Sequence, residues 1–274
     1  NSCKLKSVQL CCEKAYWTFV MAKANSSFSE VQIARRIKEG RGQGHGKDYI
    51  PWLTVQEVPS SGRSHRIYSH KTGRVHHLLS DLELAVFLSL EWESSVLDIR
   101  EQFPLLPSDT KQIAIDSGIK HPAIRGADQV MSTDFLVDCK DGPFEQFAIQ
   151  VKPAAALQDE RTLEKLELER RYWQQKQIPW FIFTDKEINP VVKENIEWLY
   201  SVKTEEVSAE LLAQLSPLAH ILQEKGDENI INVCKQVDIT YDLELGKTLS
   251  EIRALTANGF IKFNIYKSFR ANKC

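Results

Sequence analysis

The chain has 274 residues, 42% of them hydrophobic and 26% charged, which suits one large or two ordinary domains and excludes wholesale disorder or a fibre. Its longest apolar run, around Leu84–Leu90, is far shorter than the roughly 18 residues of a membrane helix, and its net charge of −2 excludes a histone-like polycation. The charge is unevenly spread, because residues 33–79 hold nine Lys and Arg against three Asp and Glu. A basic segment on an acidic body predicts a localised anionic partner.

The six cysteines form no C-x-x-C pair, so the sequence encodes neither a zinc site of that kind nor a disulfide framework, and we expect a reducing cytoplasm. The first twenty residues lack the apolar core of a signal peptide. Met21 is followed by Ala-Lys-Ala-Asn, which is typical of a natural start. We therefore expect residues 1–20 to be a non-native extension.

Hydrophobic spacing and turn signals predict an α/β core over residues 21–187. A helix over Ser27–Lys38 opens with Ser27-x-x-Glu30, and another opens at Ser80-Asp-Leu-Glu83 and runs to about Glu93. Short strand-like pieces alternate with turns over Tyr49–His77. The remaining expected elements are a strand at 96–103, a polar turn-rich connection at 105–126, strands at 130–138 and 144–151, a helix at 159–177 and a strand at 180–184. This order predicts a mixed sheet flanked by helices.

After Asn189-Pro190 the sequence predicts helices only, followed by a β-ribbon over Phe260–Phe269. The expected helices cover 191–200, 209–224, 228–237 and 249–257, the last opening with a Thr248-x-x-Glu251 cap. Helices that end in a strand pair indicate a mainly helical, winged-helix-like C-terminal domain. We place it at residues 188–274.

The hairpin around Asp141-Gly142-Pro143 carries the strongest chemical signal. A three-residue loop there pairs Asp134 with Gln150, and Lys152 then lies diagonally across from Asp134. One acid, one amide oxygen and one ammonium would converge at the strand ends. Phosphodiester hydrolysis needs oxygen ligands for Mg²⁺ and a cation beside the attacking water and the phosphate. A third group should come from elsewhere, and Glu83 is the candidate.

An acid, then an acid or a substitute for it, then x-Lys on this core resembles the restriction-endonuclease-like nucleases. Four motifs resemble the TnsA family of transposon endonucleases in particular. These motifs are Pro-Ser-Ser-Gly-Arg-Ser-His-Arg at 59–66, Gly-Arg-Val-His-His-Leu-Leu-Ser-Asp-Leu-Glu at 73–83, Asp-Ile-Arg-Glu-Gln-Phe-Pro-Leu at 98–105, and Asp134 with Gln-Val-Lys-Pro at 150–153. The resemblance covers Met21 to the C-terminus.

This resemblance implies an endonuclease of a heteromeric bacterial transposase that uses Mg²⁺, with Mn²⁺ as a substitute, to cut the 5′ ends of a transposon. It also implies a partner transposase, TnsB, that cuts the 3′ ends, and an ATPase, TnsC, that bridges to target selection. Carried over residue by residue, the catalytic triad is Glu83, Asp134 and Lys152. Gln150 is the neutral stand-in for the usual second acid, and the Val151 carbonyl is a further metal ligand.

Each of these residues also has a purely structural interpretation. Glu83 completes a Ser80-x-x-Glu83 capping box, in which its carboxylate would bond back to the N-cap amide. Lys152 alone reads as a solvated lysine at a strand end. For Asp134 a functional role is favoured, since an unpaired carboxylate inside an apolar strand is costly.

A basic edge formed by Arg63, Arg66, Lys71 and Arg74 is either a phosphate-contacting surface or a solvated face. Residues 40–47 are rich in glycine but do not match a phosphate-binding P-loop, so a basic arm on DNA is the better interpretation. Two further functions stay open. One is a stand-alone restriction endonuclease, and the other is a catalytically inert scaffold that binds DNA within a transposition complex.

Overall fold

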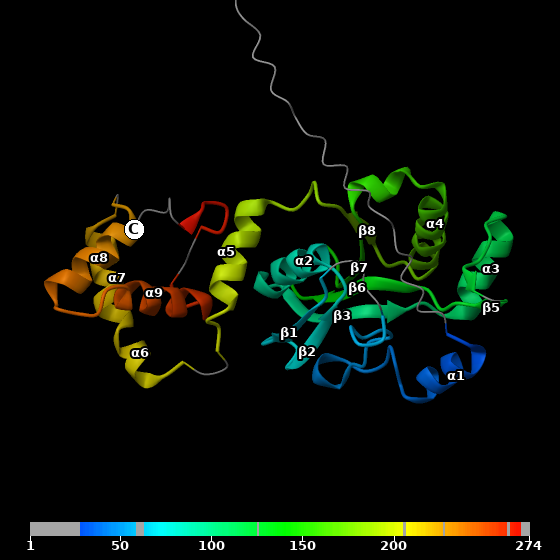
Figure 1. The fold of residues 1–274 in the computed structure, drawn as a ribbon, viewed down its shortest axis with the longest axis horizontal. Coiled ribbons are helices and arrows are strands. Elements are labelled where there is room, and N and C mark those ends of the chain that lie inside the picture. Colours follow the sequence, from blue (N-terminus) through cyan, green and yellow to red (C-terminus); the bar gives the residue numbers. More distant parts are fainter. Residues whose placement is uncertain are drawn as a thin grey trace, which may run out of the picture.

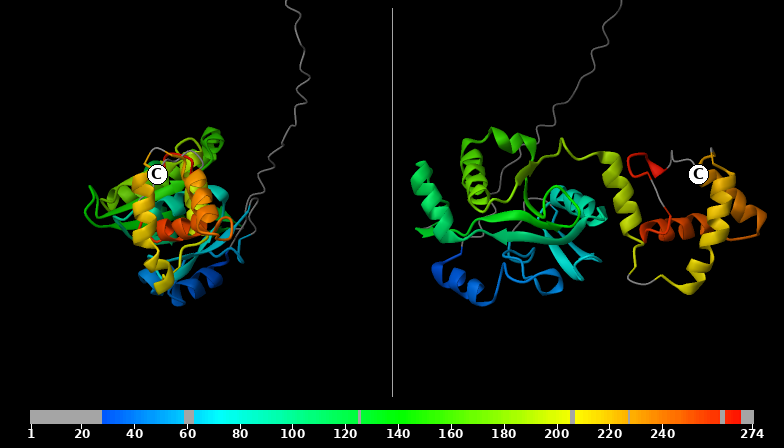
Figure 2. Two further views of the ribbon diagram at one scale, coloured as in Figure 1. Left: turned by 90° about the vertical axis from the view of Figure 1, so that its left-hand side faces the viewer. Right: turned by 180° about the vertical axis from the view of Figure 1, so that it is seen from behind.

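The computed structural model describes residues 28–58, 63–124, 126–204, 207–226, 228–261 and 264–269 (Figure 1). The expected extension at residues 1–20 lies outside this part of the chain. Helices α5–α9 lie at one end of the molecule and the sheet with its covering helices at the other (Figures 1 and 2). Among the described residues, no helix is both long and apolar enough to cross a bilayer.

A four-stranded mixed sheet forms the centre, in the order β3 (Val96–Pro104), β6 (Ser132–Cys139), β7 (Gln146–Val151) and β8 (Trp180–Phe183). The first two pairings are antiparallel and the pairing of β7 with β8 is parallel. Because α4 (Glu160–Gln175) joins β7 to β8, the predicted order of helix, three strands, helix and strand is confirmed. Two smaller pairs lie beside it, β1 (His65–Ser69) with β2 (Arg74–Leu78) and β4 (Ala123–Ile124) with β5 (Ala127–Asp128).

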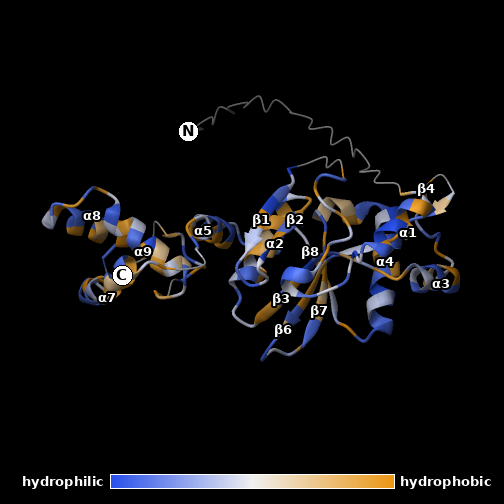
Figure 3. Ribbon diagram, turned by 90° about the horizontal axis from the view of Figure 1, so that it is seen from below, coloured by the Kyte–Doolittle hydropathy of each residue, from blue (hydrophilic) through white to orange (hydrophobic). Residues whose placement is uncertain are grey.

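Helices cover both faces of the sheet. Phe87 of α2 (Asp81–Trp92) packs in one apolar cluster with Ile149 and Val151 of β7. Ala148, the intervening residue of β7, packs in the other cluster with Trp173 of α4. This alternation is the one expected for a strand, and Figure 3 shows apolar residues recurring along the strands of the sheet.

One helix of the nuclease-like part was not predicted. α3 (Pro107–Ser117) lies where the sequence indicated a polar connection, beginning with Pro107 in its first turn and ending at Gly118, whose φ of 65° is left-handed. Only Thr110, Ile113 and Ala114 are buried, so the apolar stripe is too short to produce a clear helical period. Helix α1 (Glu30–Lys38) is present, but its cap is Ser29, paired with Gln32 in a capping box.

The C-terminal part is mainly helical, as predicted, with α5 (Pro190–Tyr200), α6 (Ala209–Ala213), α7 (Leu215–Glu224), α8 (Ile230–Thr240) and α9 (Lys247–Ala257). The predicted ribbon over 260–269 is wrong for the residues described there, which form turns whose Ile265 and Lys267 carbonyls accept hydrogen bonds from Asn195 of α5. Thr248 is not the cap of α9. Instead the Asp238 carboxylate of α8 accepts from the amides of Gly246 and Thr248.

Candidate active site

Asp134 lies on β6 in the predicted register with β7. Phe135 pairs with Ile149, and the same register sets Asp134 opposite Gln150. The Asp134 amide donates to Gln150 Oε1 over 3.2 Å, and the Val151 amide donates to Asp134 Oδ2 over 2.8 Å. Both side chains are buried. The main chain of the hairpin therefore fixes the acid and the amide relative to each other.

Glu83 reaches this point from the first turn of α2. Its amide donates to Ser80 Oγ over 3.1 Å, and Ser80 Oγ donates to Glu83 Oε1 over 3.0 Å. The carboxylate of a standard capping box would accept from the N-cap amide, but Glu83 Oε2 accepts from Leu79 N over 2.9 Å. Ser80 is the helix cap, and Glu83 aims past it toward the sheet.

Gln102 joins the two carboxylates and was not singled out from the sequence. Its side-chain nitrogen donates to Glu83 Oε2 over 3.3 Å and to Asp134 Oδ1 over 3.4 Å. It lies on β3 opposite Asp134, because Glu101 pairs with Phe135 and Phe103 with Thr133. Its sequence signal was its place in the 98–105 motif, but its position beside the two acids follows only from strand pairing.

Lys152 follows β7 directly and completes the group. Its Nζ donates to Val151 O over 2.9 Å and lies 3.5 Å from Asp134 Oδ2. Burial opposes its charge, but the carboxyl groups of Asp134, Glu169 and Glu83 raise the pKa of Lys152 above its usual value. Lys152 is therefore an ammonium ion at neutral pH. The four residues predicted for the site, Glu83, Asp134, Gln150 and Lys152, come together.

Burial changes the protonation of the acids here. Loss of solvent, helped by the nearby Asp134 carboxylate, raises the pKa of Glu83 to about 8. Burial also raises the pKa of Glu169, on α4, to about 8. Glu169 Oε1 accepts from Thr133 Oγ1 over 2.7 Å and from Trp180 Nε1 over 2.9 Å. Glu169 was missed from the sequence because its helix reads as charged and amphipathic, with nothing to mark one glutamate as buried.

The oxygen donors of the site suit a hard divalent cation. Glu83 and Asp134 supply carboxylates that converge on one amide nitrogen, while the Gln150 side chain and the Val151 carbonyl supply neutral oxygens beside them. Among the described residues, the two buried carboxyl groups share a single ammonium, that of Lys152, and a bound cation would further offset the cost of keeping them away from water. The arrangement can hold a metal ion next to an ammonium group, which is what phosphodiester hydrolysis needs.

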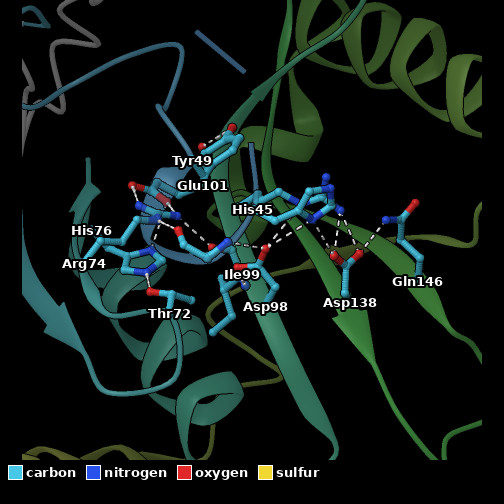
Figure 4. Close-up of polar contacts among 12 residues, drawn as sticks. His45, Tyr49, Thr72, Arg74, His76, Asp98, Ile99, Glu101, Asp138 and Gln146 are labelled. Atoms are coloured by element: carbon cyan, nitrogen blue, oxygen red, sulfur yellow. Dashed lines mark hydrogen bonds and ion pairs between the residues drawn. The ribbon is translucent and has the colours of Figure 1, made fainter. Parts of the chain in front are cut away.

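A second group of potential metal ligands lies elsewhere on the same sheet (Figure 4). His45, Asp98 and Asp138 offer ligand atoms that all lie within 4.8 Å of one another. However, the Arg100 guanidinium already donates to both oxygens of Asp138, at 2.7 and 2.9 Å, and Asp98 Oδ2 accepts from Gly46 N over 3.0 Å. These acids already have a counter-charge, so this group is a weaker candidate for a cation.

The four residues of the predicted basic edge are placed differently from one another. Arg63 is exposed and paired with Asp81 at 3.2 Å, and Arg66 is exposed. The Nζ of Lys71 donates to the Glu93 carbonyl over 2.8 Å. Arg74 is 9% exposed and donates to both oxygens of Glu101, at 2.8 and 2.6 Å (Figure 4).

Glu101 has no exposed surface, and it also lies 2.9 Å from Nδ1 of the buried His76. Although burial opposes its charge, His76 and Arg74 lower the pKa of Glu101 well below the usual range. Arg74 is thus an internal counter-ion, so its prediction as part of the basic edge is wrong, and the predicted edge keeps Arg63, Arg66 and Lys71. The buried position of Arg74 could not be predicted from its local sequence, in which it follows Gly73 and precedes Val75 and two histidines.

Two family models match the chain: "TnsA-like endonuclease N terminal" over residues 93–185 and "TnsA endonuclease C terminal" over residues 187–265. The chain is also 98% identical over 254 residues to the Escherichia coli protein "Transposon Tn7 transposition protein TnsA", a match that covers 93% of each chain. These matches agree with the expected restriction-endonuclease-like fold, and an endonuclease of this family uses a divalent metal. The chain belongs to the TnsA family of endonucleases.

Proposed function

We propose that the protein cuts the 5′ ends of a transposon in a Mg²⁺-dependent reaction during cut-and-paste transposition, with Mn²⁺ able to replace Mg²⁺. The observation that carries this proposal is the convergence of Glu83, Asp134, Gln150 and Lys152 in a chain that belongs to the TnsA family. The transposition step is suggested by the name of the Escherichia coli relative, which is a transposition protein.

Each residue has a distinct task in this proposal. Glu83 and Asp134 would hold the metal, and the Gln150 side chain with the Val151 carbonyl would complete the ligand set. A Mg²⁺ ion held there would supply Lewis-acid activation of the attacking water and of the phosphate. Lys152, charged at neutral pH and 3.5 Å from Asp134 Oδ2, orients the attacking water and stabilises the negative charge that builds up on the phosphate.

The neutral amide of Gln150 lowers the charge of the site relative to a carboxylate at that position. Fewer charged ligands mean weaker cation binding, so the protein should need more Mg²⁺ than a nuclease with three acids. We expect this weakness to restrain the isolated chain, and we propose that cutting requires partner proteins. These are the transposase TnsB, which cuts the 3′ ends, and the ATPase TnsC. All would act in the bacterial cytoplasm.

DNA contact is proposed for the exposed Arg63 and Arg66 and for Lys71, whose charges would neutralise phosphates without reading sequence. The helical part from residue 188 onward is proposed as a separate domain for protein contact. Its helix α9 carries Arg253, but the guanidinium of Arg253 donates to the Trp198 carbonyl over 3.0 Å. This arginine is therefore engaged within the protein and poorly placed to contact bases in a DNA groove.

A stand-alone restriction endonuclease would use the same residues but would cut specific DNA without partners. An inert scaffold would bind DNA and partners while the site does nothing. The buried counter-charged site favours an active enzyme over the scaffold, because a scaffold has no need to keep two carboxylates and a lysine out of water.

The test is cleavage of transposon-end DNA with Mg²⁺ in a system reconstituted with TnsB and TnsC, with each strand labelled separately. Asp134→Ala should abolish the 5′ cuts and leave the 3′ cuts intact. Unchanged 5′ cutting would mean that Asp134 is structural. Robust cutting by the purified chain alone would favour the restriction enzyme.

A further inference from the structure

Gln102 occupies a position that ordinary strand geometry does not provide. Gln102 lies in the interior of β3, yet its φ is +48°. This is a left-handed backbone conformation that residues other than glycine rarely adopt. In a regular strand residues 101 and 103 would share one face. Here Glu101 pairs with Arg74 of β2, whereas Phe103 packs on Trp173 of α4, with ring centroids 5.9 Å apart.

The surroundings of Gln102 hold this conformation in place. Its carbonyl accepts a hydrogen bond from the main-chain amide of the buried Trp52 over 3.2 Å, and the residue as a whole is only 2% exposed. Ser132 Oγ donates to Gln102 Oε1 over 3.3 Å. That contact fixes the orientation of the amide, so that its nitrogen faces the carboxylates of Glu83 and Asp134.

Strained backbone at a buried polar residue persists only where the rest of the fold enforces it, and such positions cluster at functional sites. The two carboxylates come from separate elements, a helix and a strand, and repel each other when both are ionised. One amide group that donates to both holds them together with no net charge of its own. Among the described residues, no other side chain donates to both acids.

We infer that Gln102 is a positioning residue of the endonuclease, whose amide holds Glu83 and Asp134 in the convergent arrangement that a divalent cation then takes over. The inference rests on the proposed function, because it concerns the same metal site. Gln102 contributes to cation binding through the placement of the two acids, to which its amide donates. Polar partners of metal ligands typically change metal affinity by about 10–100-fold when they are removed.

Two substitutions separate the amide from the backbone strain. Gln102→Gly removes the amide and accepts a φ of +48° without strain, whereas Gln102→Ala removes the amide and keeps the strain. Gln146→Ala is the matched control, since that amide donates to Asp138 over 2.5 Å in the same sheet but outside the site. Mn²⁺ binding to the full chain, followed by the electron paramagnetic resonance of the free ion, gives a readout that does not depend on cleavage.

Both Gln102 variants should bind Mn²⁺ about tenfold more weakly than the wild type, and Gln146→Ala should bind as the wild type does. In the reconstituted cleavage assay, the metal concentration for half-maximal 5′ cutting should rise by a similar factor. The maximal rate at saturating metal should largely return, because the ion itself then joins the acids. A purely structural role would lower the rate at every metal concentration.

Unchanged or tighter Mn²⁺ binding in both variants would overturn the inference, as would a loss confined to Gln102→Ala, which would assign the effect to strain. Asp134→Ala in the same titration separates this outcome from failure of the proposed function. If Asp134→Ala binds Mn²⁺ as tightly as the wild type, the metal site itself is misplaced. If Asp134→Ala loses binding and the Gln102 variants keep it, only the role of Gln102 is wrong.

Discussion

The main-chain amide of Val151 donates a 2.8 Å hydrogen bond to Oδ2 of Asp134, so a backbone group on one strand holds the acid of its neighbour. An asparagine at this position can keep the oxygen that accepts from Val151, and it loses the charge and the second acceptor, which faces Gln102. We therefore expect Asp134→Asn to fold as the wild type does and to lose 5′ cutting by more than about 100-fold, as befits a direct metal ligand.

The measurement is 5′-strand cleavage in the reconstituted system beside a thermal unfolding curve. The control is Asp138→Asn on the same strand, whose carboxylate is paired with Arg100 at 2.7 Å. That variant should lose some stability and keep its cutting rate per folded molecule. Equal losses of activity in both variants would show that charge on this strand, and not a metal site, is what matters.

Glu83 and Ser80 can be separated in the same way. Ser80 caps α2, so Ser80→Ala should cost about 1 kcal/mol in the free energy of unfolding and leave cutting intact. Glu83→Gln keeps the side-chain shape and should stay close to wild-type stability while 5′ cutting disappears. Denaturant unfolding and strand-resolved cleavage of both proteins give the answer. If Glu83→Gln lost stability but kept 5′ cutting, Glu83 would be a capping residue only.

Gln150→Glu should strengthen metal binding. The glutamate can still accept the hydrogen bond from Asp134 N, and it adds a negative charge to the ligand set. We expect the Mg²⁺ concentration for half-maximal 5′ cutting to fall by roughly tenfold. A higher Mg²⁺ requirement would show that repulsion from Asp134 outweighs the new ligand charge.

The stability of the metal-free protein should depend on pH through Glu169. Its pKa of about 8 in the folded protein lies above the ordinary value of 4.5, so the folded state binds the proton more tightly than the unfolded state. The stabilisation is complete below pH 4.5 and is lost as pH rises through about 8. The denaturant midpoint should fall more steeply from pH 4 to 9 in the wild type than in Glu169→Gln, because the glutamine cannot ionise. Parallel plots of midpoint against pH for the two proteins would contradict this prediction.

The internal position of Arg74 gives a contrast with the surface arginines. Arg74→Ala leaves the fully buried Glu101 with a counter-ion missing and should cost about 3–5 kcal/mol of stability. Arg66→Ala should leave stability within about 0.5 kcal/mol and weaken DNA binding in a salt-dependent way. Unfolding curves and DNA-binding titrations at two salt concentrations test both; an Arg74→Ala protein of normal stability would return Arg74 to the surface.

How far the sequence predicted the molecule depended on whether a feature was local. The turn at 141–143 set the register of β6 and β7, so the meeting of Asp134 with Gln150 followed from counting residues. Gln102 and Glu169 could not be found in this way, since one depends on a left-handed residue in a strand and the other on which side of a charged helix is buried. The start of α9 was misplaced for the same reason, because Asp238 of another helix caps it.

The tie between Arg74 of β2 and Glu101 of β3 bears on how the protein can be dissected. The N-terminal family match begins at residue 93, yet Glu83, Arg74 and His76 all lie upstream of it, and the last two are the partners of Glu101. A fragment cut at that boundary would keep Asp134 and Lys152 but would expose an acid with no counter-charge in the middle of its own sheet. The smallest piece able to stand alone must therefore include the β1–β2 pair, which makes this modest hairpin part of the nuclease rather than an appendage.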